Sequence, residues 1–489
     1  MKDQRAKAAM TPEEYAGHDG VALATLIARG EVTVAEVAAS AHTAIERANP
    51  RVRAVIETYD DRFATPEEGL GTGPMRGVPF LIKDVSDHFG GRKMEHGSRL
   101  CQGYVVPKDD YYAQMIKASG VNLVGRSATP EFSMALCADT IVNGATSNPW
   151  KEGYSTAGSS GGAAAAVASG MVPVAHASDL GGSTRGPAAW CGTVGLHPSR
   201  GRVSLGPDYG EGEQGMSQSS VVTRTIRDTA VMLDAISVPQ PGDPFIIRRP
   251  DRPYADFLTG PGRKLKIGWS ARPLMEAPVD PEVARAVEVT AKALESLGHH
   301  VEEGSPDFDL VAMDRTLTEL WYFQFDKYLD ALGERSGRKV GSDTVERASL
   351  MFYEWSRTRT AEDYFRAIEE LDAFRRQIGR WFASHDIWLN PTCAQVSQPN
   401  GVYGMNIDVA PEKFLQHEQA ACQYMVWANV CGAPAISLPL GQHTNGLPIG
   451  VQLGAKPGHE ELLIGLGAEL EQAMPWSGRI PPLHVARLG

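Results

Sequence analysis

The sequence predicts an α/β protein, and three features of the chain support that fold class. Strand-like and helix-like segments alternate from about residue 52 to about residue 236, which is the order expected of an α/β core. Short apolar runs, such as residues 172–177, are typical of buried strands. The 489 residues are 42% hydrophobic and 22% charged, with no internal repeat or low-complexity tail. This balance is typical of a globular protein with a large core.

Composition and charge argue against several partners and compartments. The chain has 47 basic and 59 acidic residues, a net charge of −12, which disfavours a nucleic-acid partner. Its six cysteines are scattered without a CxxC pair, as in a reducing compartment. Residues 1–15 lack the apolar core of a signal peptide, and no apolar run reaches the roughly 18 residues of a membrane span. We therefore expect a cytoplasmic protein that binds neither membrane nor nucleic acid.

The N-terminal part of the chain predicts two helices, a strand and a loop. Thr33 and Glu36 form a capping box that starts the second helix, and we expect Asn49 and Pro50 to end it. In order, the predicted elements are a helix over residues 19–28, a helix from the capping box to about residue 47, a strand over residues 52–58 and a glycine-rich loop over residues 69–77.

A lone lysine ends the apolar run GVPFLIKDV at residues 77–85. Burial in such a strand removes solvation from Lys83, which lowers its pKa and favours the neutral amine. A neutral amine can act as the base for a serine nucleophile. Taken by itself, Lys83 is better explained as a surface lysine at a strand end or as a salt bridge to Asp84. A catalytic role therefore needs support from the rest of the sequence.

Residues 157–203 are rich in Gly, Ser and Ala and contain two glycine clusters, each with a serine. GSSGG at 158–162 precedes an Ala-rich helix that Gly170 ends, so Ser159 is expected in a loop before a helix. DLGGS at 179–183 follows the strand over 172–177, so Ser183 is expected on a turn. His176 lies inside that strand and is expected to be packed there. Four consecutive N–H groups could form a nest for an oxyanion, those of Leu180, Gly181, Gly182 and Ser183.

The remainder of the chain predicts further helices and strands joined by one Pro/Gly/Arg-rich connection at residues 239–264. Two aromatic clusters, at 321–325 and 352–355, have helical spacing. Core packing is the favoured explanation for them, and an apolar acyl pocket is the alternative. The predicted elements are a helix over 111–119, strands over 121–124, 265–269 and 387–389, helices over 281–297 and 460–474, and a mostly helical region over 314–380.

Lys83, GSSGG and DLGGSTR, in this order and spacing, resemble the amidase signature family. The lysine precedes the first serine by 76 positions (83 to 159), and 24 positions separate the serines (159 to 183). NPW at 148–150, PAAWCG at 187–192, GAPAISLP at 432–439 and GLPIGVQ at 446–452 also match, so the resemblance runs from about residue 19 to about residue 476. Within the family, GRVSLGP at 201–207 and PGD at 241–243 look most like the 6-aminohexanoate-cyclic-dimer hydrolase branch.

The resemblance implies a fold and a mechanism. The fold would be a mixed central β-sheet covered by helices on both faces. Ser183 would be the nucleophile that forms an acyl-enzyme, Ser159 a cis serine that relays the proton, and Lys83 the base. The backbone of residues 180–183 would be the oxyanion hole, with Asp179 and Arg185 as structural support. The function would be hydrolysis of a carbon–nitrogen bond in a small-molecule amide, with no cofactor and no metal.

The resemblance also implies one amidase domain over residues 1–489. Its core signature would cover about 72–236, a helical, substrate-shaping region about 310–380, and a closing segment 387–476. The expected partner is the small-molecule amide, and a homodimer is left open. Ser178 stands where the family usually has Thr, and His197 stands where Lys is common.

Other interpretations remain. Ser183 alone could be a turn serine, and Ser159 alone a helix N-cap. GSSGG also fits G-x-S-x-G with Ser160 as nucleophile, but that motif needs a strand just before it, and a Pro- and Gly-containing loop stands there. Two rival functions are the A subunit of a tRNA-dependent amidotransferase, which shares the signature, and a binding protein on an inactive amidase scaffold.

Overall fold

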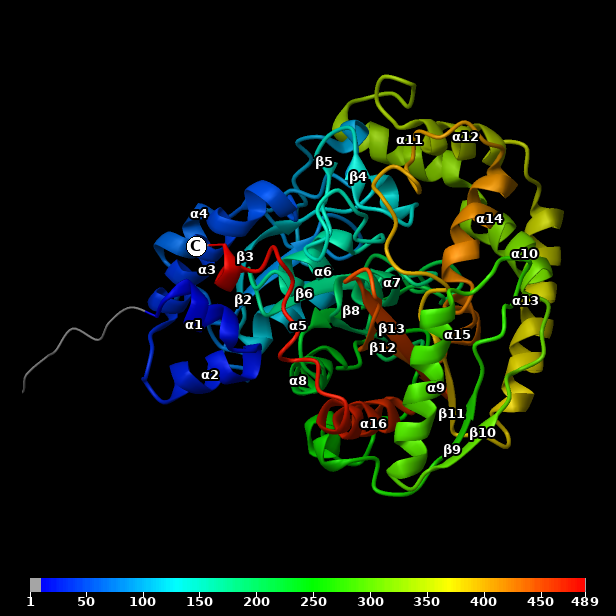
Figure 1. Cartoon of the computed structure of the whole chain (residues 1–489). Helices are drawn as coiled ribbons and strands as arrows, with labels where there is room; N and C mark the ends of the chain where they lie inside the picture. The colour runs from blue at the N-terminus through cyan, green and yellow to red at the C-terminus, as the bar shows by residue number, and fades with distance from the viewer. Residues whose placement is uncertain (1–9, 489) are drawn as a thin grey trace, which may run out of the picture.

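The computed structural model describes residues 10–488, and its centre is a mixed sheet of eleven strands with helices on both faces (Figure 1). The predicted fold class is confirmed. In sheet order the strands are β1 (Val55–Thr58), β3 (Asn122–Ser127), β2 (Pro79–Lys83), β6 (Val174–Asp179), β8 (Gln218–Thr223), β7 (Val194–His197), β12 (Ala435–Gln442), β13 (Pro448–Ala455), β11 (Ile387–Pro391), β9 (Lys266–Trp269) and β10 (His300–Glu303). A separate hairpin pairs β4 (Asp139–Thr140) with β5 (Gly144–Ala145).

Strand direction changes across the sheet. At one end β2 is parallel to both β3 and β6, and at the other end β9 is parallel to β10 and β11. The pairs between β6 and β11 are antiparallel. Because β2 and β6 run in the same direction, their carboxyl ends lie at the same edge of the sheet. This edge receives Lys83, the last residue of β2, together with the turn that follows β6.

Helices from all parts of the chain pack against the sheet and one another. The buried apolar residues form a cluster around α3, α6, β2 and β6 and a second around α9, α16, β12 and β13. The helices are α1 (Pro12–Gly17), α2 (Gly20–Ala28), α3 (Val34–Val52), α4 (Asp60–Ala64), α5 (Tyr111–Ser119), α6 (Gly161–Ala168), α7 (Arg185–Cys191), α8 (Ile226–Ile236), α9 (Pro281–Ser296), α10 (Leu310–Tyr322), α11 (Phe325–Ser336), α12 (Arg347–Ser356), α13 (Ala361–Trp381), α14 (Pro411–Cys422), α15 (Val426–Cys431) and α16 (Glu460–Ala473).

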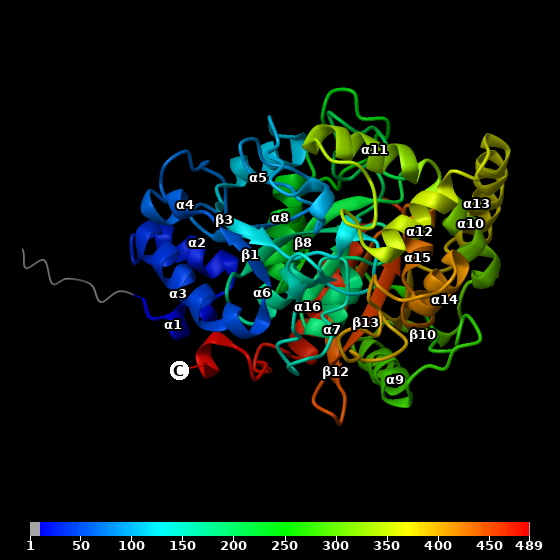
Figure 2. The ribbon, with the colours of Figure 1, turned by 90° about the horizontal axis from the view of Figure 1, so that it is seen from above.

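The region predicted to be mostly helical, residues 314–380, consists of α10 to α13. Figure 2 shows these helices gathered with α14 and α15 at one end of the molecule. Their apolar faces form two further buried clusters with residues of the closing segment. Within residues 10–488, no helix combines the length and the apolar character needed to cross a membrane.

The predicted end of the second helix is wrong. α3 continues through Pro50 to Val52, and the strand that follows begins at Val55. Ala48 and Val52 are fully buried on the core-facing side of α3, and their burial offsets the helix hydrogen bond that Pro50 cannot make. Arg53, in the left-handed region at φ 55°, ends the helix instead.

Candidate active site

Lys83 lies at the carboxyl end of β2, a strand whose five residues are all buried. The side chain is 1% exposed. Its Nζ lies 2.7 Å from Ser159 Oγ and 2.9 Å from Ser178 Oγ. Asp84, the alternative partner, instead pairs with Arg126 at 2.5 Å. The amine of Lys83 is therefore enclosed by hydroxyl groups and has no ion pair with its neighbour in the sequence.

Burial determines the charge state of Lys83. Loss of solvation lowers its pKa to about 7, although the charges of Asp179 and Asp87 act in the opposite direction. An ordinary lysine has a pKa near 10.4. Near neutral pH, a large fraction of the Lys83 amines is therefore unprotonated and can accept a proton from a hydroxyl group.

Ser159 lies in the loop before α6, as predicted. The Gly158–Ser159 peptide bond is cis. A Cβ on Gly158 would lie 2.1 Å from Ala135 O and 2.2 Å from Cys137 O, so only glycine fits against this backbone. The N-cap of α6 is Ser160, whose side chain caps no N–H, so the N-cap interpretation of Ser159 is wrong.

Ser183 lies on the turn between β6 and α7, also as predicted. Its carbonyl oxygen accepts a hydrogen bond of 3.0 Å from the N–H of Ser160, which ties this turn to the Ser159 loop. The residue is partly exposed, whereas Ser159 is fully buried. The Ser183 hydroxyl makes no hydrogen bond to residues 10–488, and thus none to Ser159. The structure brings Lys83 and Ser159 into direct contact and leaves the Ser183 hydroxyl open.

The predicted oxyanion nest is partly occupied. The N–H of Gly182 donates to Asp179 Oδ1 at 2.7 Å and is not available to a ligand. The N–H groups of Leu180, Gly181 and Ser183 have no acceptor within the described part of the chain. Three of the four predicted donors therefore remain free on this turn.

Asp179 and Arg185 form a buried ion pair at the two ends of the turn. Arg185 donates from Nε and Nη2 to the two carboxylate oxygens at 2.9 and 2.8 Å, the bidentate geometry that fixes orientation. Burial would raise the pKa of Asp179, but the Arg185 guanidinium and the hydrogen bonds hold it well below its usual range. Asp179 also accepts the N–H groups of Gly182 and Thr184. The turn is therefore shaped around one carboxylate.

Two residues that the sequence analysis missed complete this network. Asn429, on α15, accepts from Arg185 Nη2 at 2.6 Å and donates to Asp179 Oδ1 at 2.9 Å. Gln452, on β13, accepts from Arg185 Nη1 at 2.9 Å. Gln452 ends the GLPIGVQ segment that carried the resemblance, but its contact with a residue 267 positions earlier could not be inferred from spacing.

His176 and Ser178 surround Lys83 from β6. His176 is fully buried, as predicted; its Nδ1 accepts the Lys83 N–H at 3.2 Å and its Nε2 lies 2.8 Å from Asp87. Within residues 10–488 it makes no hydrogen bond to Ser159 or Ser183. Ser178 entered the sequence analysis only as a departure from the family pattern. Its hydroxyl is the second hydrogen-bond partner of the Lys83 amine.

An apolar wall lies beside the turn. A Cβ on Gly181 would lie 2.8 Å from Cη2 of Trp321, and one on Gly182 would lie 2.6 Å from Cε of Met425. Trp321 is partly exposed. Tyr322 and Phe352, from the same aromatic clusters, instead stack in the core with ring centroids 3.6 Å apart. Core packing therefore explains those two residues, and only Trp321 of these three lies next to the candidate site.

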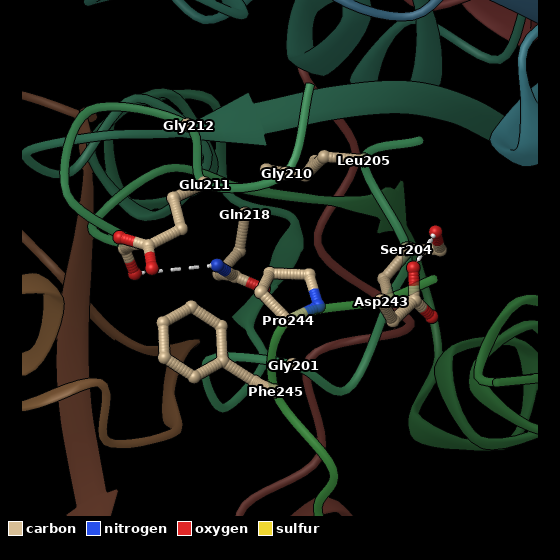
Figure 3. Close-up of a pocket in the computed structure, with 12 residues that line it drawn as sticks. Gly201, Ser204, Leu205, Gly210, Glu211, Gly212, Gln218, Asp243, Pro244 and Phe245 are labelled. Atoms are coloured by element: carbon tan, nitrogen blue, oxygen red, sulfur yellow. Dashed lines mark hydrogen bonds between the residues drawn. The ribbon is translucent and has the colours of Figure 1, made fainter. Parts of the chain in front are cut away.

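Figure 3 shows a small pocket lined by the loop from Gly201 to Gln218 and by Asp243, Pro244 and Phe245. Gln218 is the register partner of Asp179 across β8 and β6. Ser204 donates to Asp243 at 2.5 Å and links the two sides of the pocket. Neither Lys83 nor the two candidate serines line it.

The fold agrees with the comparisons to known proteins. The Amidase family model matches residues 25–464. The chain therefore belongs to the amidase signature family, and it is an amidase, a hydrolase of carbon–nitrogen amide bonds.

The similar proteins include cyclic-amide hydrolases. The chain is 34% identical over 479 residues to the 6-aminohexanoate-cyclic-dimer hydrolase of Paenarthrobacter ureafaciens, covering 95% of this chain and 96% of the relative. A solved structure of 6-aminohexanoate cyclic dimer hydrolase complexed with substrate superposes with a TM-score of 0.91 at 32% identity, covering 96% and 99% of the two chains. A bacterial aryl acylamidase, 24% identical with a TM-score of 0.81 and covering 94% and 99%, shares the fold.

The close packing around Gly158 generates a test. In Gly158→Ala the new methyl group would collide with the carbonyl oxygens of Ala135 and Cys137, so the Ser159 loop must move away from Lys83. We expect amidase activity to fall by roughly 100-fold or more, because displacement by about 1 Å can cost that much. Gly379→Ala on α13, where nothing lies within 4 Å, is the matched control. Wild-type kcat/KM in Gly158→Ala would contradict the assigned packing.

Proposed function

We propose that the chain hydrolyses a small-molecule amide through Ser183, Ser159 and Lys83. The observation that carries the proposal is the 2.7 Å contact between the buried Lys83 amine and the Ser159 hydroxyl. The Ser159 loop is tied to the turn that carries Ser183, a partly exposed serine whose hydroxyl makes no hydrogen bond to residues 10–488. The proposed arrangement is a nucleophile, a proton relay and a base in sequence.

In the proposed reaction the neutral Lys83 amine accepts the proton of Ser159 while Ser159 accepts that of Ser183. The Ser183 oxygen bonds to the amide carbon, and the negative charge that develops on the carbonyl oxygen is met by free N–H groups of residues 180–183. The carbon–nitrogen bond then breaks, and the leaving amine takes the proton back along the same path. Water, activated by the same groups, hydrolyses the acyl-enzyme. The hydrogen bond between Ser159 and Ser183 forms when substrate binds, because catalytic hydrogen bonds are often long or absent without ligand.

For the substrate, we propose an uncharged amide with an apolar acyl part, linear or cyclic. Trp321 and Met425 against the turn support this class, because methylene or aryl groups beside Ser183 would contact them. The similar hydrolase from Paenarthrobacter ureafaciens is named for a cyclic dimer of 6-aminohexanoate, which favours including cyclic amides in any substrate panel. The amidotransferase subunit and the inactive binding protein remain the rival functions. Copurifying subunits with glutaminase activity would support the first, and failure of Ser183 to be acylated would support the second.

The first prediction from the proposed mechanism concerns the nucleophile and the base. Ser183→Ala and Lys83→Ala should each lower kcat by about 10⁴-fold or more while the protein stays folded. The loss is large in both because the nucleophile cannot react without its base, nor the base act without the nucleophile. Amide hydrolysis and far-UV circular dichroism measure the two properties. Ser169→Ala, at the end of α6 and bonded only to helix carbonyls, is the matched control. Undiminished turnover by either variant would refute the triad.

The second prediction concerns pH. Activity needs neutral Lys83, and its pKa is about 7. As pH falls below that value the amine becomes protonated, so kcat/KM should decrease by about tenfold per pH unit and reach a plateau above it. Steady-state rates between pH 5 and pH 9 measure the profile. Activity that stays flat down to pH 5 would argue against a neutral lysine base.

The third prediction concerns the apolar wall. Trp321→Ala should raise KM for amides with long or aryl acyl groups by about 10- to 100-fold, and Trp321→Phe by less, because contact area is lost. A series of anilides of increasing acyl length measures the effect. Trp355→Ala, on α12 in the other predicted aromatic cluster, is the control. Equal effects at all acyl lengths, or from both positions, would show that Trp321 does not line the acyl site.

A further inference from the structure

A second cavity lies away from Lys83, Ser159 and Ser183. It has a volume of about 260 Å³ and is bounded by the α1–α2 junction, the start of α8 and the chain that follows α16. These segments come from the N-terminal, middle and C-terminal parts of the chain, and in Figure 1 the chain after α16 runs past α8. Drug-sized ligands occupy pockets of about 300–1,000 Å³, so this cavity suits a smaller molecule.

The lining of the cavity is positively charged in a protein whose net charge is −12. The lining contains one carboxylate, that of Asp19, which pairs with Arg227. It contains three arginines: Arg224, Arg227 and Arg479. Arg224 and Arg479 have no ion pair with the described residues. Arg224 donates to the carbonyl oxygens of Ala16 and His18, and Arg479 to those of Pro439 and Gly441. Asp228, the nearby buried carboxylate, accepts the N–H groups of Gly20 and Val21.

Each of these two guanidinium groups retains unused donors. An arginine has five N–H groups, and Arg224 and Arg479 each use only their two terminal nitrogens for the carbonyl contacts. Carbonyl groups hold the arginines in place but do not neutralise them. Arg479 has no carboxylate near it among the described residues, whereas Arg224 is attracted by Asp228 and Asp19 without forming an ion pair with either. Two guanidinium groups that are partly withdrawn from water and lack a direct ion pair favour an anion in the space between the chain segments.

The remaining walls are apolar or neutral. The indole N–H groups of Trp150 and Trp476 donate to Cys191 O and Arg224 O, so the ring surfaces are what these residues offer. His484 is 3% exposed, and its Nδ1 accepts the N–H of Ala486 at 3.1 Å. Its Nε2 is buried and without a partner in residues 10–488. That nitrogen faces Gly170, which does not line the cavity. The cavity thus combines cationic groups and flat apolar surfaces.

We propose that this cavity is a binding site for a small organic anion, a carboxylate carried on a flat apolar body. The carboxylate would contact the free N–H groups of Arg224 and Arg479, and the apolar body would lie against Trp150 and Trp476. The site is separate from the hydrolytic site and does not depend on the proposed mechanism.

Isothermal titration of the full chain with benzoate tests the proposal, with benzamide, hexanoate and inorganic phosphate as comparisons. Benzoate should bind saturably, and benzamide and phosphate should bind at least about tenfold more weakly than benzoate. The affinity of hexanoate should lie between that of benzoate and that of benzamide. Arg479→Gln should weaken benzoate about tenfold or more, since it removes a charge-assisted contact. Ala22→Phe, which fills the cavity from α2, should abolish binding without touching an arginine.

Two controls separate this site from the hydrolytic one. Arg248→Gln removes an arginine that is 82% exposed and outside the cavity, and it should leave benzoate binding unchanged. Trp321→Ala alters only the apolar wall beside Ser183 and should do the same. The proposal is overturned if benzoate does not bind, if Trp321→Ala removes the binding while Arg479→Gln and Ala22→Phe keep it, or if phosphate binds as tightly as benzoate.

Discussion

The proposed hydrolytic site depends on one buried amine. Lys83 ends a strand with no exposed residue, and the parallel pairing of β2 with β6 places its Nζ beside Ser178 and Ser159. No carboxylate of residues 10–488 forms an ion pair with it, so removal from water lowers its pKa to about 7. A buried lysine that is partly unprotonated near neutral pH is unusual in a folded protein. Burial of the amine costs stability, and in the mechanism proposed above its unprotonated form accepts a proton from Ser159.

The turn that carries Ser183 depends equally on long-range contacts. Asp179 holds Gly182, Thr184 and Arg185, and Arg185 is held by Asn429 and Gln452 from the closing segment. The sheet also depends on contacts between distant parts of the chain, because β7 pairs with β12 from the C-terminal segment. We propose that the whole chain is one folding and catalytic unit, since the C-terminal segment shapes a turn that lies more than 200 positions earlier in the sequence.

The sequence allowed most local elements to be predicted, and the site only in part. The β2 strand, the Ser159 loop and the Ser183 turn follow from apolar runs and glycine clusters, which act over a few residues. The end of α3 was missed because burial of Ala48 and Val52 outweighs the local effect of Pro50. The contact of Ser178 with Lys83, the occupation of the Gly182 N–H and the roles of Asn429 and Gln452 arise from tertiary packing. Periodicity and spacing carry no information about such contacts.

The most direct test is a measurement of the Lys83 pKa itself. Lysine labelled with ¹³C at Cε in the Ser183→Ala protein can be titrated by NMR, with the Lys83 resonance assigned by its loss in Lys83→Met. The account predicts one lysine that titrates near pH 7 while the others titrate near 10.4. If the Lys83 signal titrates with the others near pH 10, the amine is charged at neutral pH and cannot be the base.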